Sequence, residues 1–166
     1  MTLKGKAWKF PDDISTDHIA PGRLFHLRSN LPEFAKHVLE DADPDFASNM
    51  SKGDFVVAGN NFGLGSSREH APQIIKIAGV SAVIAKSFAR IFYRNAINIG
   101  LLVLEADTDK IDAKDELEVD IKTGVIKNIT KNIEIKFTPL PDVMIKLLND
   151  GGLIEHIKKH GDFELV

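Results

Sequence analysis

The sequence predicts an α/β fold with a small parallel βαβαβ core, an antiparallel β meander and C-terminal helices, in one domain over residues 1–166. Two observations lead to this prediction. Between residues 54 and 104, three short apolar runs alternate with two segments of helical periodicity. Beyond residue 107, polar and apolar residues alternate between turn signals, which is typical of antiparallel strands.

The N-terminal third has the least regular pattern. We expect residues 4–10 to form an edge strand and residues 32–39 to form a helix with Pro32 in its first turn. Between them, residues 11–31 are predicted to be a long loop. Long loops in compact domains often carry function.

The first strand and helix of the core lie on either side of Gly59. Residues 54–58 form an apolar run, which predicts a buried strand. The helix that follows ends at Gly79. Its apolar face is formed by Ile74, Ile75, Ile77 and Ala78.

A second strand–helix–strand passage completes the core. Residues 80–85 and 101–104 are apolar runs that predict strands, and Ser87 offers an N-cap for a helix over 88–98. The apolar face of that helix is expected at Phe88, Ile91, Phe92 and Ala96. This order of elements predicts parallel strands joined by right-handed crossovers and covered on both faces.

The last third supplies the meander and the final helices. Three strands and two helices are predicted, at residues 116–121, 125–128, 133–137, 142–148 and 153–159.

The composition excludes several classes of function. The formal net charge of -3 gives no electrostatic attraction to nucleic acid or to acidic membranes. No apolar run approaches membrane-spanning length, and no signal-peptide core stands at the start, so we expect a soluble cytoplasmic protein. The chain has no cysteine, so it cannot build disulfides, zinc–thiolate sites or cysteine-ligated iron–sulfur clusters.

The stretch 59–69 is the strongest candidate for a binding site, because it joins a strand to a helix. Gly63 and Gly65 lack a Cβ, so the backbone can come close to a ligand. At a helix start, an anion meets backbone N–H groups and the positive end of the helix dipole. The run is not a dinucleotide fingerprint, since Arg68 stands where the third glycine would be, and no Gly-Lys-Ser/Thr phosphate loop follows.

The same stretch has a purely structural interpretation. Ser66 and Glu69 have the spacing of a capping box, which would satisfy N–H groups at the helix start. Arg68 in that first turn would oppose the helix dipole by about 0.3–1 kcal/mol. Such a conflict is tolerated more readily where an anion is bound, so a carboxylate or another small anion is the favoured ligand.

Other charged groups allow two interpretations each. The run 12–18 could bind a metal or form a solvated turn rich in local hydrogen bonds. Arg23 and Arg28 could be a second anion clamp or surface charges. Arg90 and Arg94 lie one helical turn apart and could bind an anion or pair with carboxylates. His156 and His160 are interpreted as a surface pair, and no metal site is assigned.

Three blocks of sequence resemble signature blocks of the 3-isopropylmalate dehydratase small-subunit family, which is equivalent to the swivelling domain of aconitase. They lie at residues 12–19, 57–71 and 85–100. The resemblance implies a single swivelling β/β/α domain. It also implies a hydro-lyase of leucine biosynthesis, active only with a large subunit that carries a 4Fe–4S cluster.

The resemblance also implies roles for individual residues. Ser66 corresponds to the catalytic base and Arg68 to a clamp for a substrate carboxylate. Ser67 and Asp17 belong to the surroundings of the active site, and Gly65 lies in the substrate-binding turn.

The substrate is open between two classes. The loop 24–29 lies where the family distinguishes substrates, and isopropylmalate enzymes tend to be apolar there. Arg28 departs from that pattern and would suit a third carboxylate, as in homoaconitate or citrate; dimethylmalate is a further alternative. A non-enzyme alternative is an anion-binding regulatory module that uses the same turn.

Overall fold

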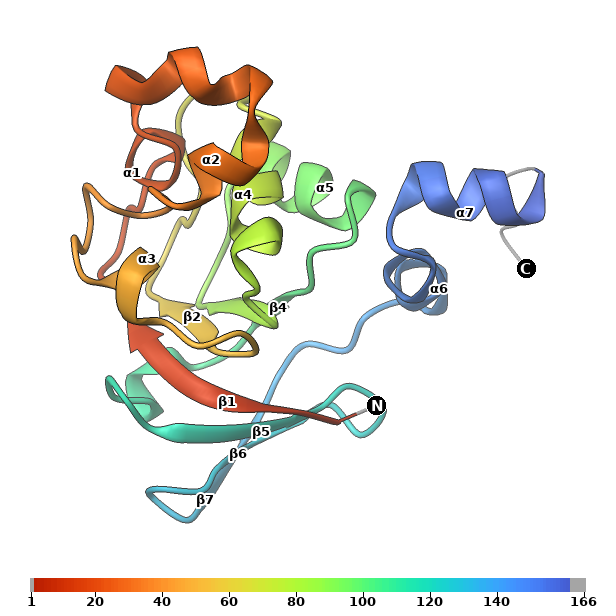
Figure 1. Ribbon diagram of the computed structural model, residues 1–166. Coiled ribbons are helices and arrows are strands. Elements are labelled where there is room, and N and C mark those ends of the chain that lie inside the picture. Colours follow the sequence, from red (N-terminus) through yellow and green to blue (C-terminus); the bar gives the residue numbers. More distant parts are fainter. Residues whose placement is uncertain (1, 162–166) are drawn as a thin grey trace.

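The computed structural model describes residues 2–161 and contains one seven-stranded mixed sheet, in the order β4-β3-β2-β1-β5-β6-β7 (Figure 1). The first four strands run parallel, namely β1 (Thr2–Lys9), β2 (Phe55–Ala58), β3 (Ala82–Ala85) and β4 (Val103–Glu105). The antiparallel meander consists of β5 (Glu116–Asp120), β6 (Val125–Asn128) and β7 (Ile133–Lys136). The predicted α/β fold, with its parallel core and meander, is confirmed.

Strand β1 joins the two halves of the sheet. Its first part pairs antiparallel with β5, from Thr2 to Lys6, and its last part pairs parallel with β2, from Ala7 to Lys9. The prediction of an edge strand is therefore wrong. The local pattern does not reveal which strands flank β1, because both partners come from distant parts of the chain.

The parallel strands are covered on both faces. Val56, Val83 and Val103 pack against the helical core, whereas Val57 and Ile84 belong to a second core beneath the meander. This alternation follows from the two-residue period of a strand. The helices on the first face are α1 (Thr16–Ile19), α2 (Leu31–Ala35), α4 (His70–Ala78) and α5 (Arg90–Asn98), with α3 (Phe46–Asn49) nearby (Figure 1).

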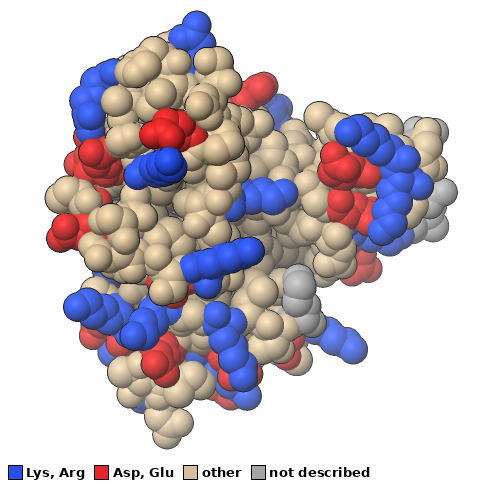
Figure 2. All heavy atoms as spheres, viewed as in Figure 1, with Lys and Arg blue, Asp and Glu red and all other residues tan. Residues whose placement is uncertain are grey.

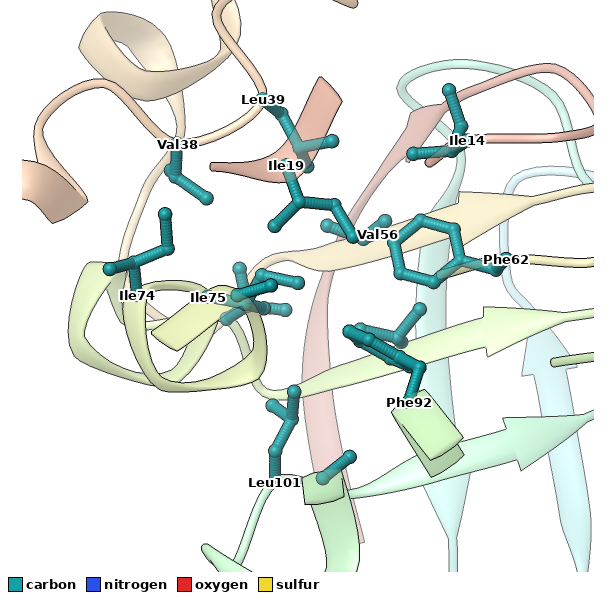
Figure 3. Packing of buried hydrophobic residues seen from close by; sticks show 14 of the residues in the cluster. Ile14, Ile19, Val38, Leu39, Val56, Phe62, Ile74, Ile75, Phe92 and Leu101 are labelled. Carbon is teal, nitrogen blue, oxygen red and sulfur yellow. The ribbon is translucent and has the colours of Figure 1, made fainter. Parts of the chain in front are cut away.

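The turn after β2 packs against α5 in the helical core. The rings of Phe62 and Phe92 meet edge to face, with centroids 5.2 Å apart (Figure 3). Ile74 and Ile75 of α4 pack in the same cluster, and Val56 lies on the strand beneath (Figure 3). Because both rings are buried, the turn that follows Phe62 is fixed relative to the start of α5.

Both predicted serine caps are wrong. Helix α4 begins only at His70, so Ser66 lies ahead of it, and no side-chain cap is found at Glu69. Helix α5 begins at Arg90, and the Ser87 Oγ instead accepts a hydrogen bond from the backbone N–H of Asn61 at 2.7 Å.

The predicted apolar helix faces are only partly right. Ile74 and Ile75 are buried, but Ile77 is exposed. In α5, Phe92 is buried, whereas Ile91 is 44% exposed. The spacing of apolar residues does not reveal which of them the rest of the fold covers, because that depends on packing with distant segments.

The segment before β2 is more regular than a loop. It contains α1 and a 3-10 segment, Gly22–Ser29, within the predicted loop 11–31. Helix α2 has Pro32 in its first turn, as predicted, but it ends at Ala35 rather than at residue 39.

The last elements within residues 2–161 are two helices, α6 (Asp142–Asp150) and α7 (Leu153–His160), which extend the predicted bounds slightly. They form a lobe beside the carboxyl end of α5 (Figure 1). A further 3-10 turn, Thr108–Lys110, follows β4. None of the helices within residues 2–161 is both long enough and apolar enough to cross a bilayer.

Candidate active site

Three loops meet at the carboxyl ends of β1, β2 and β3. Parallel pairing continues past the strands, because Ser15 bridges to Leu64 and Phe62 bridges to Phe88. The backbone N–H of Thr16 donates to the carbonyl of Leu64 at 2.8 Å. These bonds hold the early loop, the Gly-rich turn and the start of α5 side by side.

A pocket of about 220 Å³ lies where these loops meet. It is lined by Thr16, Gly63, Gly65, Ser66, Ser67, Arg68, Ala89, Arg90, Ile91, Phe92 and Asn95. The carboxyl ends of parallel strands are where ligands bind in open α/β sheets.

The lining favours an anion. It includes the two guanidinium side chains of Arg68 and Arg90 and no carboxylate. The first turn of α5 lines the pocket, and no side chain caps that helix at Ala89. Unsatisfied N–H groups and the positive end of the helix dipole therefore face the pocket.

Ser66 is held by a buried hydroxyl. The Oγ1 atom of Thr16, which is 3% exposed, donates to the backbone carbonyl of Ser66 at 3.0 Å. The same Oγ1 lies 3.4 Å from the Ser66 Oγ. Ser66 itself is exposed and lines the pocket, with its backbone carbonyl held by Thr16.

Arg68 is oriented by the early loop. Its Nη1 donates to the Asp17 Oδ1 and to the carbonyl of Ala20, both at 2.9 Å. These are the hydrogen bonds that the described residues make with the guanidinium, so Nη2 and Nε stay available to an anion. The hydrogen bond from Arg68 lowers the pKa of Asp17, and the N–H of Gly22 adds to this effect.

Arg68 therefore does not oppose the dipole of α4 from within its first turn. The residue precedes the helix, which begins at His70. The predicted conflict with the helix dipole is wrong, although the guanidinium does line the pocket.

The structure brings most of the predicted site residues together. Gly65, Ser66, Ser67 and Arg68 line the pocket, and Asp17 is joined to it through Arg68. Their roles in binding and catalysis stay predictions.

Arg28 lies apart from this group. It is exposed on the 3-10 segment, with its guanidinium carbon 4.3 Å from the centroid of the Phe25 ring, and it is not among the residues that line the pocket. Arg23 pairs with Asp41 at 2.9 Å, as a surface charge would.

His70 is a residue that sequence reasoning missed. Its ring stacks on Phe34, with centroids 5.4 Å apart, and meets Phe25 edge to face at 5.6 Å. Burial lowers the pKa of His70, and the charges of Arg68 and Arg28 lower it further. His70 thus connects the 3-10 segment with the start of α4, and its surroundings favour the neutral form of the ring.

Thr16 and Asn95 were also missed. Nothing in their local sequence marks them, because they reach the pocket only through the pairing of loops that are far apart in the chain. Arg90 and Arg94 were considered together, but only Arg90 is found in the lining.

The acidic run 12–18 is a hydrogen-bonded loop that leads into α1, which begins at Thr16. The Asp12 Oδ1 accepts from the N–H of Asn60 at 2.6 Å. Ser15 caps α1, and His18 completes the capping box. Of the two interpretations of this run, the structure supports the hydrogen-bonded turn.

We expect Gly63→Ala to lower the free energy of unfolding by about 3 kcal/mol or more. Gly63 has φ +86°, and a Cβ there would lie 2.2 Å from the Phe92 Cγ. Urea unfolding measures the loss. Gly124→Ala is the matched control, since Gly124 also has a positive φ but its Cβ would be 3.8 Å from the nearest atom. Equal losses in both variants would show that contact with Phe92 is not the cause.

Known proteins resemble this chain over almost its full length. Residues 27–109 match the aconitase C-terminal domain family. The chain is 68% identical over 165 residues to 3-isopropylmalate dehydratase small subunit 2 of Archaeoglobus fulgidus, covering 99% of this chain and 100% of the relative. It is 61% identical over 165 residues to small subunit 1 of Thermotoga maritima, with 99% of each covered.

A solved structure agrees with these relatives. The crystal structure of 3-isopropylmalate dehydratase from Methanocaldococcus jannaschii superimposes with a TM-score of 0.92 at 46% identity, covering 97% of this chain and 96% of that one. The resemblance inferred from the three sequence blocks is thereby confirmed. This chain belongs to the family of 3-isopropylmalate dehydratase small subunits, which carries the aconitase C-terminal domain.

Proposed function

We propose that this chain is the small subunit of a cytoplasmic hydro-lyase of leucine biosynthesis, which interconverts 2-isopropylmalate and 3-isopropylmalate by dehydration and rehydration. The observation that carries the proposal is its identity of 68% to a protein of that name over 99% of the chain. The anion pocket at the carboxyl edge of the sheet adds independent support, because the substrate is a dicarboxylate.

Ser66 would act as the base. During dehydration it removes a proton from the carbon beside a carboxylate, the freed electron pair forms the C=C bond, and hydroxide leaves the neighbouring carbon. Rehydration at the other carbon reverses these steps. A serine hydroxyl is a poor base unless its anionic form is stabilised. Arg68, Arg90 and the start of α5 surround it with donors and positive charge.

Arg68 would bind one substrate carboxylate. Its Nη1 is held by Asp17 and Ala20, which fixes the plane of the guanidinium. Nη2 and Nε can then form a bidentate pair with a carboxylate. Arg90 and the first turn of α5 suit the second carboxylate, since both face the same pocket.

The apolar part of the lining suits an isopropyl group. Ile91 and Phe92 line the pocket beside Arg90. Burying branched carbons against such a wall stabilises the complex by about 25 cal/mol per Å² of apolar surface. We therefore favour isopropylmalate over a tricarboxylate as the substrate.

The site would be completed by a second chain. An iron–sulfur cluster is held by cysteine thiolates, and this chain has none, so its residues do not fit a cluster. The expected 4Fe–4S cluster would belong to the large subunit and would supply a Lewis acid for the departing hydroxyl. The pocket is open to solvent at Ser66, where a partner can close it.

We expect Arg28→Val to leave kcat/KM for isopropylmalate within about twofold of the wild type. Arg28 stacks on Phe25 outside the pocket lining, so its charge is not needed for a dicarboxylate. Steady-state assays of the assembled enzyme with isopropylmalate, homoaconitate and citrate give the comparison. A tricarboxylate activity that is present in the wild type and lost in this variant would assign Arg28 to a third carboxylate and favour a homoaconitase.

An anaerobic assay of the reconstituted complex tests the function itself. Co-expression with the large subunit should yield a complex that turns over isopropylmalate faster than homoaconitate, citrate or dimethylmalate. A complex that binds these acids without turning any of them over would favour the anion-binding regulatory module.

A further inference from the structure

The junction of α6 and α7 gathers a second group of polar side chains, at the opposite end of α5 from the pocket. Gly152, which lies between the two helices, packs against the backbone of Asn98 at the end of α5. Asp150 ends α6, and His156 and His160 lie one turn apart on α7. Figure 2 shows positive and negative side chains side by side on the lobe that these two helices form.

The three side chains converge on one carboxylate oxygen. The Asp150 Oδ2 lies 2.7 Å from the His156 Nδ1 and 3.0 Å from the His160 Nε2. The three potential ligand atoms all lie within 4.8 Å of one another. The imidazole rings are 4.6 Å apart between centroids. Within residues 2–161, no other group of three histidine or carboxylate side chains has this arrangement.

Two of the three side chains are buried. The side chains of Asp150 and His156 are only 9% and 3% exposed, whereas that of His160 is 35% exposed. The earlier interpretation of both histidines as surface residues is therefore wrong for His156. A cavity of about 250 Å³ opens beside the group and leaves room for a further ligand.

We propose that Asp150, His156 and His160 form a binding site for Zn²⁺ or a similar borderline divalent metal ion. Two imidazole nitrogens and one carboxylate oxygen are a donor set that zinc accepts, with water at the fourth position. Histidines four residues apart on a helix present their rings to the same side, as chelation requires.

The ligand atoms must rearrange to accept the ion. Tetrahedral zinc with bonds of 2.0–2.1 Å places its ligand atoms about 3.3 Å apart. The Asp150 oxygen is closer than that to both nitrogens, so the rings must withdraw from it by well under 1 Å. The two nitrogens lie within 4.8 Å of each other and must also reach a separation of about 3.3 Å. The exposed His160 can make most of this adjustment.

Lys159 does not block the site. Its Nζ lies 2.8 Å from the Asp150 Oδ1, which is the other carboxylate oxygen, and its side chain is 64% exposed. A carboxylate that binds a metal through one oxygen commonly accepts a hydrogen bond through the other. The metal would join the end of α6 to α7 and so stabilise the C-terminal lobe.

Zinc titration of the metal-free chain, followed by calorimetry and native mass spectrometry, tests the proposal. We expect one Zn²⁺ per chain, and a loss of affinity of about tenfold or more in His160→Gln and Asp150→Asn. His160 is the decisive position, because its exposure makes its replacement harmless to folding, whereas Asp150→Asn can loosen the lobe.

His37→Gln is the matched control. His37 also contacts a carboxylate, with its Nδ1 2.7 Å from the Glu40 Oε2, but no second histidine is placed there. This variant should bind Zn²⁺ as the wild type does. The absence of saturable zinc binding, or an unchanged affinity in His160→Gln, would overturn the proposal. Neither result depends on the proposed enzyme activity, because no turnover is measured.

Discussion

Replacing Ser66 by alanine is expected to lower kcat of the assembled enzyme by about 10²–10⁴-fold, the range that a general base contributes. The substitution removes the hydroxyl that would accept the proton and leaves the backbone contact from Thr16 to the Ser66 carbonyl in place. Folding and subunit assembly should therefore be retained. Steady-state assays of the complex, with assembly checked by size-exclusion chromatography, measure both.

Ser67→Ala is the control for this experiment. Ser67 lines the same pocket and is also exposed, so a general effect of removing a hydroxyl from the turn would appear in both variants. We expect a clearly smaller loss for Ser67→Ala. A Ser66→Ala complex with wild-type turnover would refute the assignment of the base.

Replacing Arg68 by lysine is expected to lower kcat/KM by about 10²-fold or more, with most of the loss in KM. The guanidinium contacts Asp17 and Ala20 through Nη1 and can still bind a carboxylate through its other nitrogens. A lysine ammonium cannot make both sets of bonds, because it is a single point of charge.

Arg23→Lys is the control for the general effect of replacing a guanidinium by an ammonium group. Arg23 is an arginine in the same early segment, and it pairs with Asp41 and Glu40 at the surface. Its replacement should leave kcat/KM within about twofold of the wild type. If Arg68→Lys behaved in the same way, Arg68 would not be the carboxylate clamp.

The strands could be predicted because their signal is local. Residues 54–58 and 80–85 are continuous apolar runs, and the structure places β2 and β3 within them. The meander could also be predicted, since its alternation of polar and apolar residues and its turn residues are both local features of the sequence. The position of β1 was not, because a strand's neighbours in the sheet are set by pairing with distant segments.

The predictions of where α4 and α5 begin were wrong for a related reason. Ser66 and Ser87 have the right side chains for caps, but each hydroxyl has a different partner across the loops at the sheet edge, namely Thr16 and the N–H of Asn61. A local capping motif does not reveal that its hydroxyl will instead contact a residue far away in the sequence.

The residues of the candidate site also differ in whether the local sequence predicts them. Ser66 and Arg68 stand in one recognisable stretch, and the structure places both in the pocket lining. Thr16 and Asn95 come from two other elements, α1 and α5, and no local sequence pattern marks them. His156 was interpreted as a surface residue because the local sequence showed no further ligand beside it and His160, yet it is buried against Asp150.

A subunit titration tests the division of the active site between two chains most directly. With the large subunit held at a fixed concentration, isopropylmalate turnover should rise from zero as this chain is added and then saturate. Added Ser66→Ala chain should compete for the large subunit and reduce that turnover. Turnover by this chain alone, or full activity of the large subunit without it, would contradict a shared site.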